Sequence, residues 1–154
     1  MDIKIKYHVE NMPELIPIGG MRTSNWIDMR AADDTFIPQG ESAMIPLGVS
    51  MQLPEGYEAH VAPRSSTFKN YGLICTNSFG IIDTSYCGDD DIWKFPVYCL
   101  EGKTTLNGRV GTLVKKNDRI CQFRIMKVQP DIDFKTVTTL RNPNRGGIGS
   151  TGIE

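Results

Sequence analysis

The chain has 154 residues, of which 40% are hydrophobic, and its 17 Lys and Arg nearly balance its 18 Asp and Glu. This length suits one domain with its own core. The balance of charge argues against a duplex nucleic-acid-binding protein, which normally presents a basic face. No window approaches the ~18 continuous apolar residues of a membrane span, and the charged N-terminus lacks the apolar segment of a signal peptide. We therefore expect a cytoplasmic protein with reduced cysteines that binds neither nucleic acid nor membranes.

Short segments with a hydrophobic period of two, separated by Gly and Pro, predict an all-β sandwich or barrel. In chain order the expected strands are residues 3–7, 43–53, 57–63, 92–100, 119–128 and 133–137. Within the second, Pro46 and Gly48 indicate a bulge or a sheet edge. The one helix candidate covers residues 65–72, with Ser caps at its start and Gly72 at its end.

The chain changes character after Leu140, where Gly, Asn, Ser and Thr dominate. Such a segment buries too little apolar surface to fold alone. We therefore expect one domain over residues 1–140 and a flexible arm over residues 141–154, which is either a frayed terminus or a segment that orders on a ligand. The run GGIGSTG in the arm allows close backbone approach. With the hydroxyls of Ser150 and Thr151 it is a candidate phosphate site.

The first chemical motif is PRSSTF, residues 63–68. Arg64 carries a fork of N–H donors that suits phosphate oxygens. Ser65 and Ser66 add hydroxyl donors at the start of the expected helix, where backbone N–H groups lack partners. Together these groups form a candidate anion site; the alternative is an ordinary helix cap beside a surface arginine.

A second motif is the strand-like run WIDMRAA, residues 26–32, in which Asp28 lies between apolar neighbours. An aspartate in such a place needs a partner. The candidates are Arg30, which alternation places on the same side, Arg64, or a hydrated metal ion. A purely structural ion pair is the alternative interpretation.

A third motif is DRICQFRI, residues 118–125. Alternation along a strand places Cys121 and Phe123 on one face, and Arg119 with them. Gln122 takes the other face, where its amide is either a ligand contact or an ordinary outward group.

The stretch FGIIDTSYCGDDD, residues 79–91, follows Asn77 and places Gly80, Asp83 and Tyr86 at intervals of three. Asp83 comes directly after two isoleucines. We therefore expect it to be desolvated on one side, with its pKa raised toward the range of a general base. The three adjacent aspartates are expected to form a solvated turn, because neighbouring side chains in an extended chain alternate in direction and rarely converge on one ion.

Taken in order, five stretches resemble the five motifs of the homotrimeric dUTP diphosphatases (dUTPases): WIDMRAA, PRSS, N-x-x-GIIDTSYCG, DRICQF and RGGIGSTG. The resemblance spans residues 26–152. It implies a jelly-roll-like distorted barrel (β-clip) and a homotrimer with active sites where subunits meet. The implied reaction is hydrolysis of dUTP to dUMP and pyrophosphate with Mg²⁺.

The resemblance also implies roles for individual residues. Asp83 would orient and deprotonate the water that attacks the α-phosphorus, with Ser65 and Arg64 as further catalytic residues. Asp28 would hold the hydration shell of Mg²⁺ and is the expected partner of Arg64. The residues expected to bind substrate are Ser66, Asn77, Gly80, Ile82, Tyr86, Gln122, Arg145, Gly146, Gly147, Ile148, Ser150 and Thr151.

Within that set, the serines of PRSS would contact the α and β phosphates, and Gln122 would reach the phosphate chain. Tyr86 would pack under the deoxyribose and leave no room for a 2′-hydroxyl. Asn77 and the backbone of residues 80–82 would read the uracil edge, because fixed backbone groups reject cytosine by leaving polar groups unpaired. The arm would close over the nucleotide and exclude water.

Some positions depart from the family pattern. The first motif reads Asn25-Trp26 where Ala-Gly usually precedes the aromatic or aliphatic residue. Pro143 stands where the family usually has an Arg, two positions before Arg145. This difference affects the γ-phosphate contact that the resemblance assigns to Arg145. Ile148 replaces an aromatic residue that usually stacks on uracil, and Ile cannot stack with the same geometry.

The segment after the third motif is unusually aromatic. We hypothesise that Trp93 or Phe95 supplies the missing stack over the base.

Two alternatives remain. A dCTP deaminase resembles a dUTPase in fold, but the deaminase segment that carries a general acid/base at the base ring is not visible here. A dUTPase that also binds a regulatory protein partner is the other alternative.

Overall fold

The computed structural model describes residues 1–8, 17–19 and 24–147. Within them the chain forms twelve strands and one short helix, which confirms the predicted all-β class. The elements are β1 (Lys4–Tyr7), β2 (Ile27–Arg30), β3 (Thr35–Pro38), β4 (Ser42–Pro46), β5 (Val49–Gln52), β6 (Tyr57–Pro63), α1 (Thr67–Tyr71), β7 (Leu73–Cys75), β8 (Gly80–Ile82), β9 (Lys94–Cys99), β10 (Thr104–Leu106), β11 (Arg109–Val114) and β12 (Arg119–Lys127). No helix in these residues is long and apolar enough to cross a membrane.

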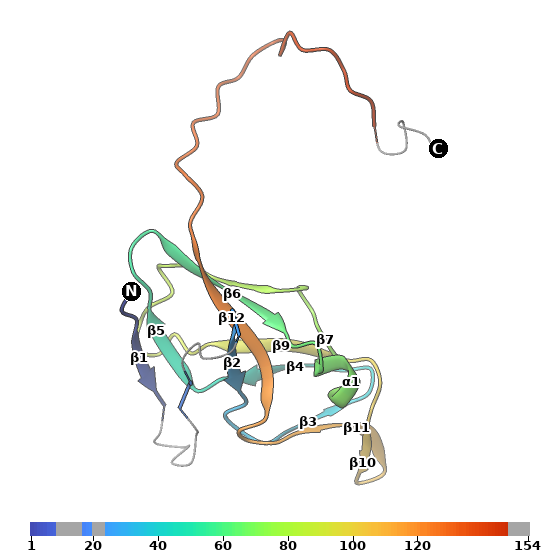
Figure 1. Ribbon diagram of the computed structural model, residues 1–154. Helices are drawn as coiled ribbons and strands as arrows, with labels where there is room; N and C mark the ends of the chain where they lie inside the picture. Colours follow the sequence, from blue (N-terminus) through green and yellow to red (C-terminus); the bar gives the residue numbers. More distant parts are fainter. Residues whose placement is uncertain (9–16, 20–23, 148–154) are drawn as a thin grey trace.

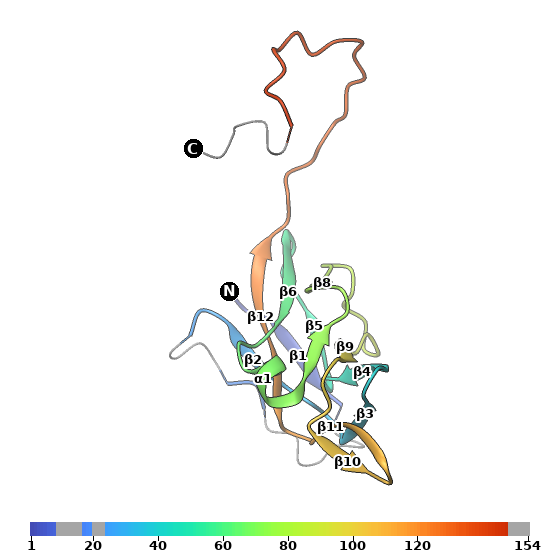
Figure 2. The ribbon, with the colours of Figure 1, turned by 90° about the vertical axis from the view of Figure 1, so that its right-hand side faces the viewer.

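The strands form four small antiparallel sheets (Figures 1 and 2), in the orders β1-β5, β10-β11-β3, β2-β12-β6-β8 and β4-β9-β7. Most of these pairs join segments distant in sequence; β12, for example, lies between β2 and β6. In its sheet β8 is an edge strand and pairs with β6 alone. The outer edge of β8 therefore keeps backbone N–H and C=O groups that no strand takes.

The segment 43–53, expected to contain a bulge or an edge, is two strands in different sheets. Gly48, between β4 and β5, has a φ of 69°, a left-handed conformation that glycine adopts without strain. The chain therefore leaves one sheet at Pro46 and enters another at Val49.

The predicted helix is confirmed as α1, but a threonine fixes its start. Ser66 is the N-cap residue and makes no side-chain capping hydrogen bond. The Thr67 hydroxyl instead accepts a hydrogen bond from the Arg64 backbone N–H at 2.9 Å and donates one to the Ile120 carbonyl at 3.0 Å. These bonds tie the PRSS segment to the start of β12.

Gly72 ends the helix as predicted, with a φ of 64°. A Cβ at this position would lie 1.7 Å from the Glu101 carbonyl oxygen, a distance that no side chain tolerates. The close approach holds α1 against the segment that follows β9, through hydrogen bonds from the Leu100 and Glu101 N–H groups to the Gly72 carbonyl.

The aromatic residues of the segment after the third motif belong to the core. Trp93 and Phe95 are both 0% exposed, and the Trp93 ring packs edge-on against Phe123 with 5.3 Å between ring centroids. Alternation along β9 turns Lys94 and Pro96 outward. The hypothesis that Trp93 or Phe95 stacks on a base is therefore wrong, because neither ring reaches a surface.

The predicted strand over residues 133–137 is also wrong. Residues 128–147 form neither strand nor helix and run away from the body of the molecule (Figure 1). A strand needs a neighbour to take its backbone hydrogen bonds, and no strand of the described chain lies beside this segment. Phe134 is accordingly 88% exposed.

Candidate active site

A cluster of charged groups lies where β2, β6 and β12 run side by side. The Asp28 carboxylate accepts a hydrogen bond from Arg64 Nε at 2.8 Å and from Arg119 Nη1 at 3.3 Å. Arg64 Nη1 also donates to Ser66 Oγ at 3.3 Å. Gln122 pairs with Asp28 in the strand register and donates from Nε2 to the Pro63 carbonyl at 3.0 Å.

The expected pairing of Asp28 with Arg64 is therefore present, whereas Arg30 does not take part. Arg30 donates instead to the Asn117 carbonyl at 2.7 Å. Two guanidinium groups surround one carboxylate, and Ser65 is exposed beside them. This excess of positive charge and N–H donors suits a phosphate chain.

Arg119 is the member of this cluster that simple alternation misplaced. The β12 register shifts between Arg119 and Cys121, so that Ile120 and Cys121 are both buried. The extra residue of this bulge reverses the alternation and moves Arg119 to the face of Asp28 and Gln122. The adjacent apolar pair Ile120-Cys121 was the available signal, since two successive inward residues are incompatible with a regular strand.

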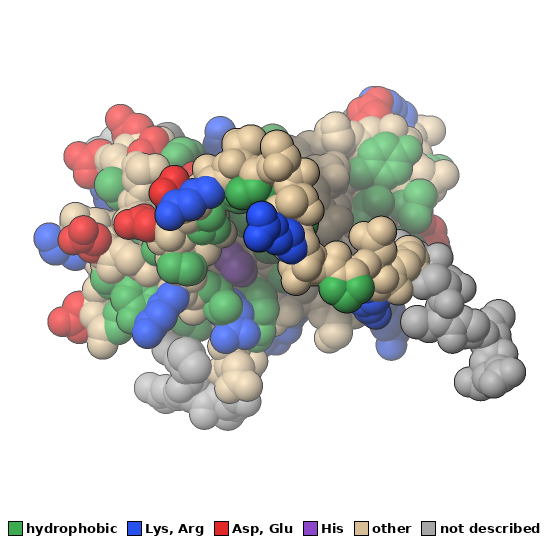
Figure 3. Space-filling model, turned by 90° about the horizontal axis from the view of Figure 1, so that it is seen from above, with side chains coloured by type: hydrophobic (Ala, Val, Ile, Leu, Met, Phe, Trp, Pro, Cys, Tyr) green, Lys and Arg blue, Asp and Glu red, His purple; other side chains and the backbone are tan. Residues whose placement is uncertain are grey.

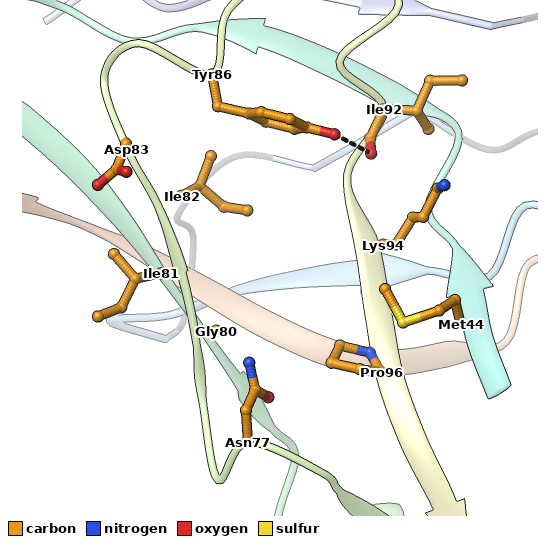
Figure 4. A pocket seen from close by; sticks show the side chains of 10 residues that line it. All are labelled: Met44, Asn77, Gly80, Ile81, Ile82, Asp83, Tyr86, Ile92, Lys94 and Pro96. Carbon is orange, nitrogen blue, oxygen red and sulfur yellow. Dashed lines mark hydrogen bonds between the residues drawn. The ribbon is translucent and has the colours of Figure 1, made fainter. Parts of the chain in front are cut away.

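The residues of the third motif line a separate pocket of about 390 Å³ (Figure 4). This volume lies in the range of small-molecule sites. The lining residues are Met44, Asn77, Gly80, Ile81, Ile82, Asp83, Tyr86, Ile92, Lys94 and Pro96. Sequence reasoning found the members from β8 and its flanking turns, and it missed those that β4 and β9 contribute.

Within this pocket the Tyr86 hydroxyl donates to the Ile92 carbonyl at 3.2 Å, which spans the gap between the turn after β8 and the start of β9 (Figure 4). The side-chain oxygen Oδ1 of Asn77 accepts a hydrogen bond from Cys75 Sγ at 3.0 Å. The expectation that Asp83 is partly desolvated is wrong for the single chain, where Asp83 is exposed. It follows the end of an edge strand, and no other segment of the described chain covers it.

Asp83 of the pocket and Ser65 of the charged cluster lie far apart within one chain. Ile82 pairs with Ala59 near the start of β6, whereas Arg64 and Ser65 follow Pro63 at its end. Asp83 and Ser65 are thus separated by about seven residues along β6, on the order of 20 Å at ~3.3 Å per residue. One chain therefore does not bring Asp83 and Ser65 to the same phosphate.

The predicted turn at the three aspartates is confirmed. Asp89 and Asp90 form an exposed turn, and the Asp91 carboxylate accepts the Gly88 N–H at 2.7 Å. Asp89 also lies 3.8 Å from Lys6 Nζ. No group of three or more His, Cys, Asp or Glu is arranged for a metal ion within residues 1–8, 17–19 and 24–147.

Asp28 is the residue best suited to a hydrated Mg²⁺. Its carboxylate has about four lone-pair sites, of which the two guanidinium groups occupy two. Mg²⁺ usually keeps several waters and binds through one or two carboxylates together with substrate phosphates. A single carboxylate beside an anion site therefore fits an ion that the phosphate chain itself would bring.

The described candidate residues of the C-terminal arm lie neither at the charged cluster nor at the pocket. Arg145, Gly146 and Gly147 belong to the extended segment that leaves the body (Figure 1). Ile148, Ser150 and Thr151 lie outside the described residues.

Comparisons with known proteins agree with this arrangement of motifs. The dUTPase family model matches residues 17–152. The chain is 54% identical, over the full length of both chains, to the SPbeta prophage-derived deoxyuridine 5′-triphosphate nucleotidohydrolase YosS of Bacillus subtilis. It is 33% identical over 134 residues to the deoxyuridine 5′-triphosphate nucleotidohydrolase of Maricaulis maris, covering 83% of this chain and 81% of the relative.

Solved structures with the same fold include two phage enzymes. The dUTPase of Staphylococcus bacteriophage 80alpha with dUpNHpp superimposes with a TM-score of 0.77 at 20% identity, over 99% of both chains. A mutant dUTPase from phage phi11 of S. aureus, described for its coordination of a structural Mg(II) ion, gives a TM-score of 0.71 at 18% identity, over 92% of this chain and 100% of that one. These likenesses confirm the jelly-roll-like fold, and the family match confirms the resemblance seen in the motifs. The chain belongs to the dUTPase family.

Proposed function

We propose that this member of the dUTPase family hydrolyses dUTP to dUMP and pyrophosphate by attack of water on the α-phosphorus. The observation that carries the proposal is a pocket of about 390 Å³ that gathers Asn77, Asp83 and Tyr86 beside an unpaired strand edge. These are the groups that recognition of a deoxyuridine and activation of a water require.

The nucleoside binds between β8 and β9. Fixed N–H and C=O groups on the outer edge of β8, with Asn77, read the polar edge of uracil. Cytosine presents the opposite donor pattern and leaves buried polar groups unpaired, which costs far more than a lost apolar contact. The Tyr86 ring packs against the deoxyribose and excludes a ribose 2′-hydroxyl.

Asp83 orients the attacking water and accepts its proton, which requires that the water lie within hydrogen-bond reach of the carboxylate. Arg64, Ser65, Ser66 and Gln122 hold the phosphate chain, and we add Arg119 to this set because its guanidinium joins Arg64 at Asp28. A bound Mg²⁺ would supply positive charge that offsets the negative charge of the phosphate chain. Asp28 would contact the ion's hydration shell.

The separation of the two groups supports a homotrimer with shared sites. Asp83 and Ser65 act on the same α-phosphate only if they come from different subunits, since one chain holds them on the order of 20 Å apart. The single chain also exposes hydrophobic side chains among charged ones on the face from which the C-terminal segment leaves (Figure 3). In the segment between β12 and the arm, the exposed hydrophobic side chains are Ile132, Phe134, Val137 and Leu140, which burial against another subunit would stabilise.

The arm completes the site in this proposal. Arg145, Gly146 and Gly147 with Ile148, Ser150 and Thr151 close over the bound nucleotide and exclude water. The division into a domain of residues 1–140 and an arm of residues 141–154, the cytoplasmic location and a regulatory protein partner stay predictions.

The direct test is pyrophosphate release from dUTP, UTP, dTTP and dCTP, with Mg²⁺ and with EDTA. We expect pyrophosphate release only from dUTP, and only when Mg²⁺ is present. Replacing Asp83 by Asn should abolish this release. Ammonia from dCTP would instead identify a deaminase of the same fold. No pyrophosphate from dUTP would refute the proposal.

A further inference from the structure

The nucleoside pocket has two walls, and the motif residues account for only one of them. The first wall is β8 with its flanking turns. The second is the outer face of β4 and β9, which contributes Met44, Lys94 and Pro96 (Figure 4). No motif of the chain includes these three residues.

Strand register explains why this wall faces the pocket. Met44 pairs with Pro96 across β4 and β9, so both project from the same face of the sheet. Their neighbours Ile45 and Phe95 point the other way and are 0% exposed. Met44 is 57% exposed, and its thioether therefore lies open to a ligand.

We propose that Met44, backed by Pro96, is the apolar surface that covers the face of the uracil ring. The inference rests on the proposed function and identifies the residue that sets affinity for the base. A flat base needs an apolar partner on its face, and the core positions of Trp93 and Phe95 exclude both of these aromatic rings. A methionine sulfur makes favourable contacts with π systems and adapts its shape to them.

The position of Met44 within the pocket agrees with this role. In Figure 4 Asn77 and Gly80, which read the base, lie at the same end of the pocket as Met44 and Pro96. Tyr86 and the Ile92 carbonyl lie at the other end, where the sugar binds. Met44 is thus at the level of the base and away from the reacting phosphate.

The test compares Met44→Ala with Met44→Leu, which keeps the volume and apolar character of the side chain. We expect Met44→Ala to raise KM for dUTP about fivefold and to leave kcat within about twofold, because Met44 touches no reacting atom. Met44→Leu should remain close to the unsubstituted protein. Leu106→Ala is the matched control, since Leu106 is a similarly exposed apolar residue on β10 that does not line the pocket.

Inhibition by inorganic tripolyphosphate separates a base contact from general damage to the site. Tripolyphosphate has no base, so its inhibition constant should be the same for Met44→Ala and the unsubstituted protein. If Met44→Ala hydrolyses dUTP with an unchanged KM, the role of Met44 is overturned while the proposed function stands. A tripolyphosphate constant that rises in step with KM would have the same consequence. An unsubstituted protein that does not hydrolyse dUTP would overturn the proposed function, and the role of Met44 with it.

Discussion

Replacing Asp83 by Asn in one set of subunits and Arg64 by Ala in another tests whether the two halves of each site come from different chains. Asp83 borders the pocket beside β8, and Arg64 lies at the far end of β6. Loss of a general base lowers the rate by about 10²–10⁴-fold, and loss of a preorganised donor to the phosphates by about 10²–10³-fold. Each variant alone should therefore be nearly inactive.

In the proposed homotrimer, assemblies that contain both variants should regain activity in a predictable amount. When equal amounts of the two variants assemble at random, a site that takes its halves from different subunits has both halves intact in about one quarter of cases. A site contained in one chain is never intact. The expected recovery for shared sites is therefore about 25% of the unsubstituted rate per site over all trimers, and about one third once trimers of a single variant are removed. Sites within a chain would recover no activity.

The assay is pyrophosphate release at saturating dUTP from subunits co-expressed with two different tags and purified through both. Each variant co-expressed with a second tagged copy of itself is the control for the procedure. A mixed preparation no more active than the sum of its parents, with trimers shown to contain both chains, would contradict the shared-site arrangement. It would also require a large movement of β8 toward the end of β6 within one subunit.

Two further predictions concern single residues. Trp93 is fully buried, and its indole N–H has no hydrogen-bond partner in the described chain; removing an unsatisfied donor offsets part of the lost packing. Trp93→Phe should therefore change the free energy of unfolding by less than about 1.5 kcal/mol, whereas Trp93→Ala should lower it by about 3–5 kcal/mol. Urea denaturation measures both values, and equal losses in the two variants would refute this account. Arg119→Ala should raise KM for dUTP about tenfold while lowering stability by no more than about 1 kcal/mol, because the Arg119 side chain is 54% exposed. Arg109→Ala, which breaks the exposed pair with Glu41, is the control, and an equal KM in both variants would exclude Arg119 from the phosphate site.

Local sequence determined much of this protein. The alternation of YEAHVAP predicted β6 with its observed bounds, and Gly72 marked the end of the helix. The order of the five motifs carried the family. The lone Asp28 in an apolar strand implied a partner, which the family resemblance assigned to Arg64. These features depend on residues close in sequence or on charges that require compensation, so the pattern alone is sufficient to recognise them.

Only the tertiary structure decided the remaining features, because each depends on which segments become neighbours. A bulge at Ile120 turns Arg119 toward Asp28, and alternation cannot reveal a bulge. The inward direction of Phe95 depends on the pairing of β9 with β4, which also aligns Met44 with Pro96, and Trp93 is held by backbone hydrogen bonds with Leu47 and Val49. Residues 133–137 alternate like a strand but have no partner strand among the described residues. Asp83 likewise follows two isoleucines, yet it is exposed, because burial of a side chain depends on the segments that pack over it and not on its neighbours in sequence.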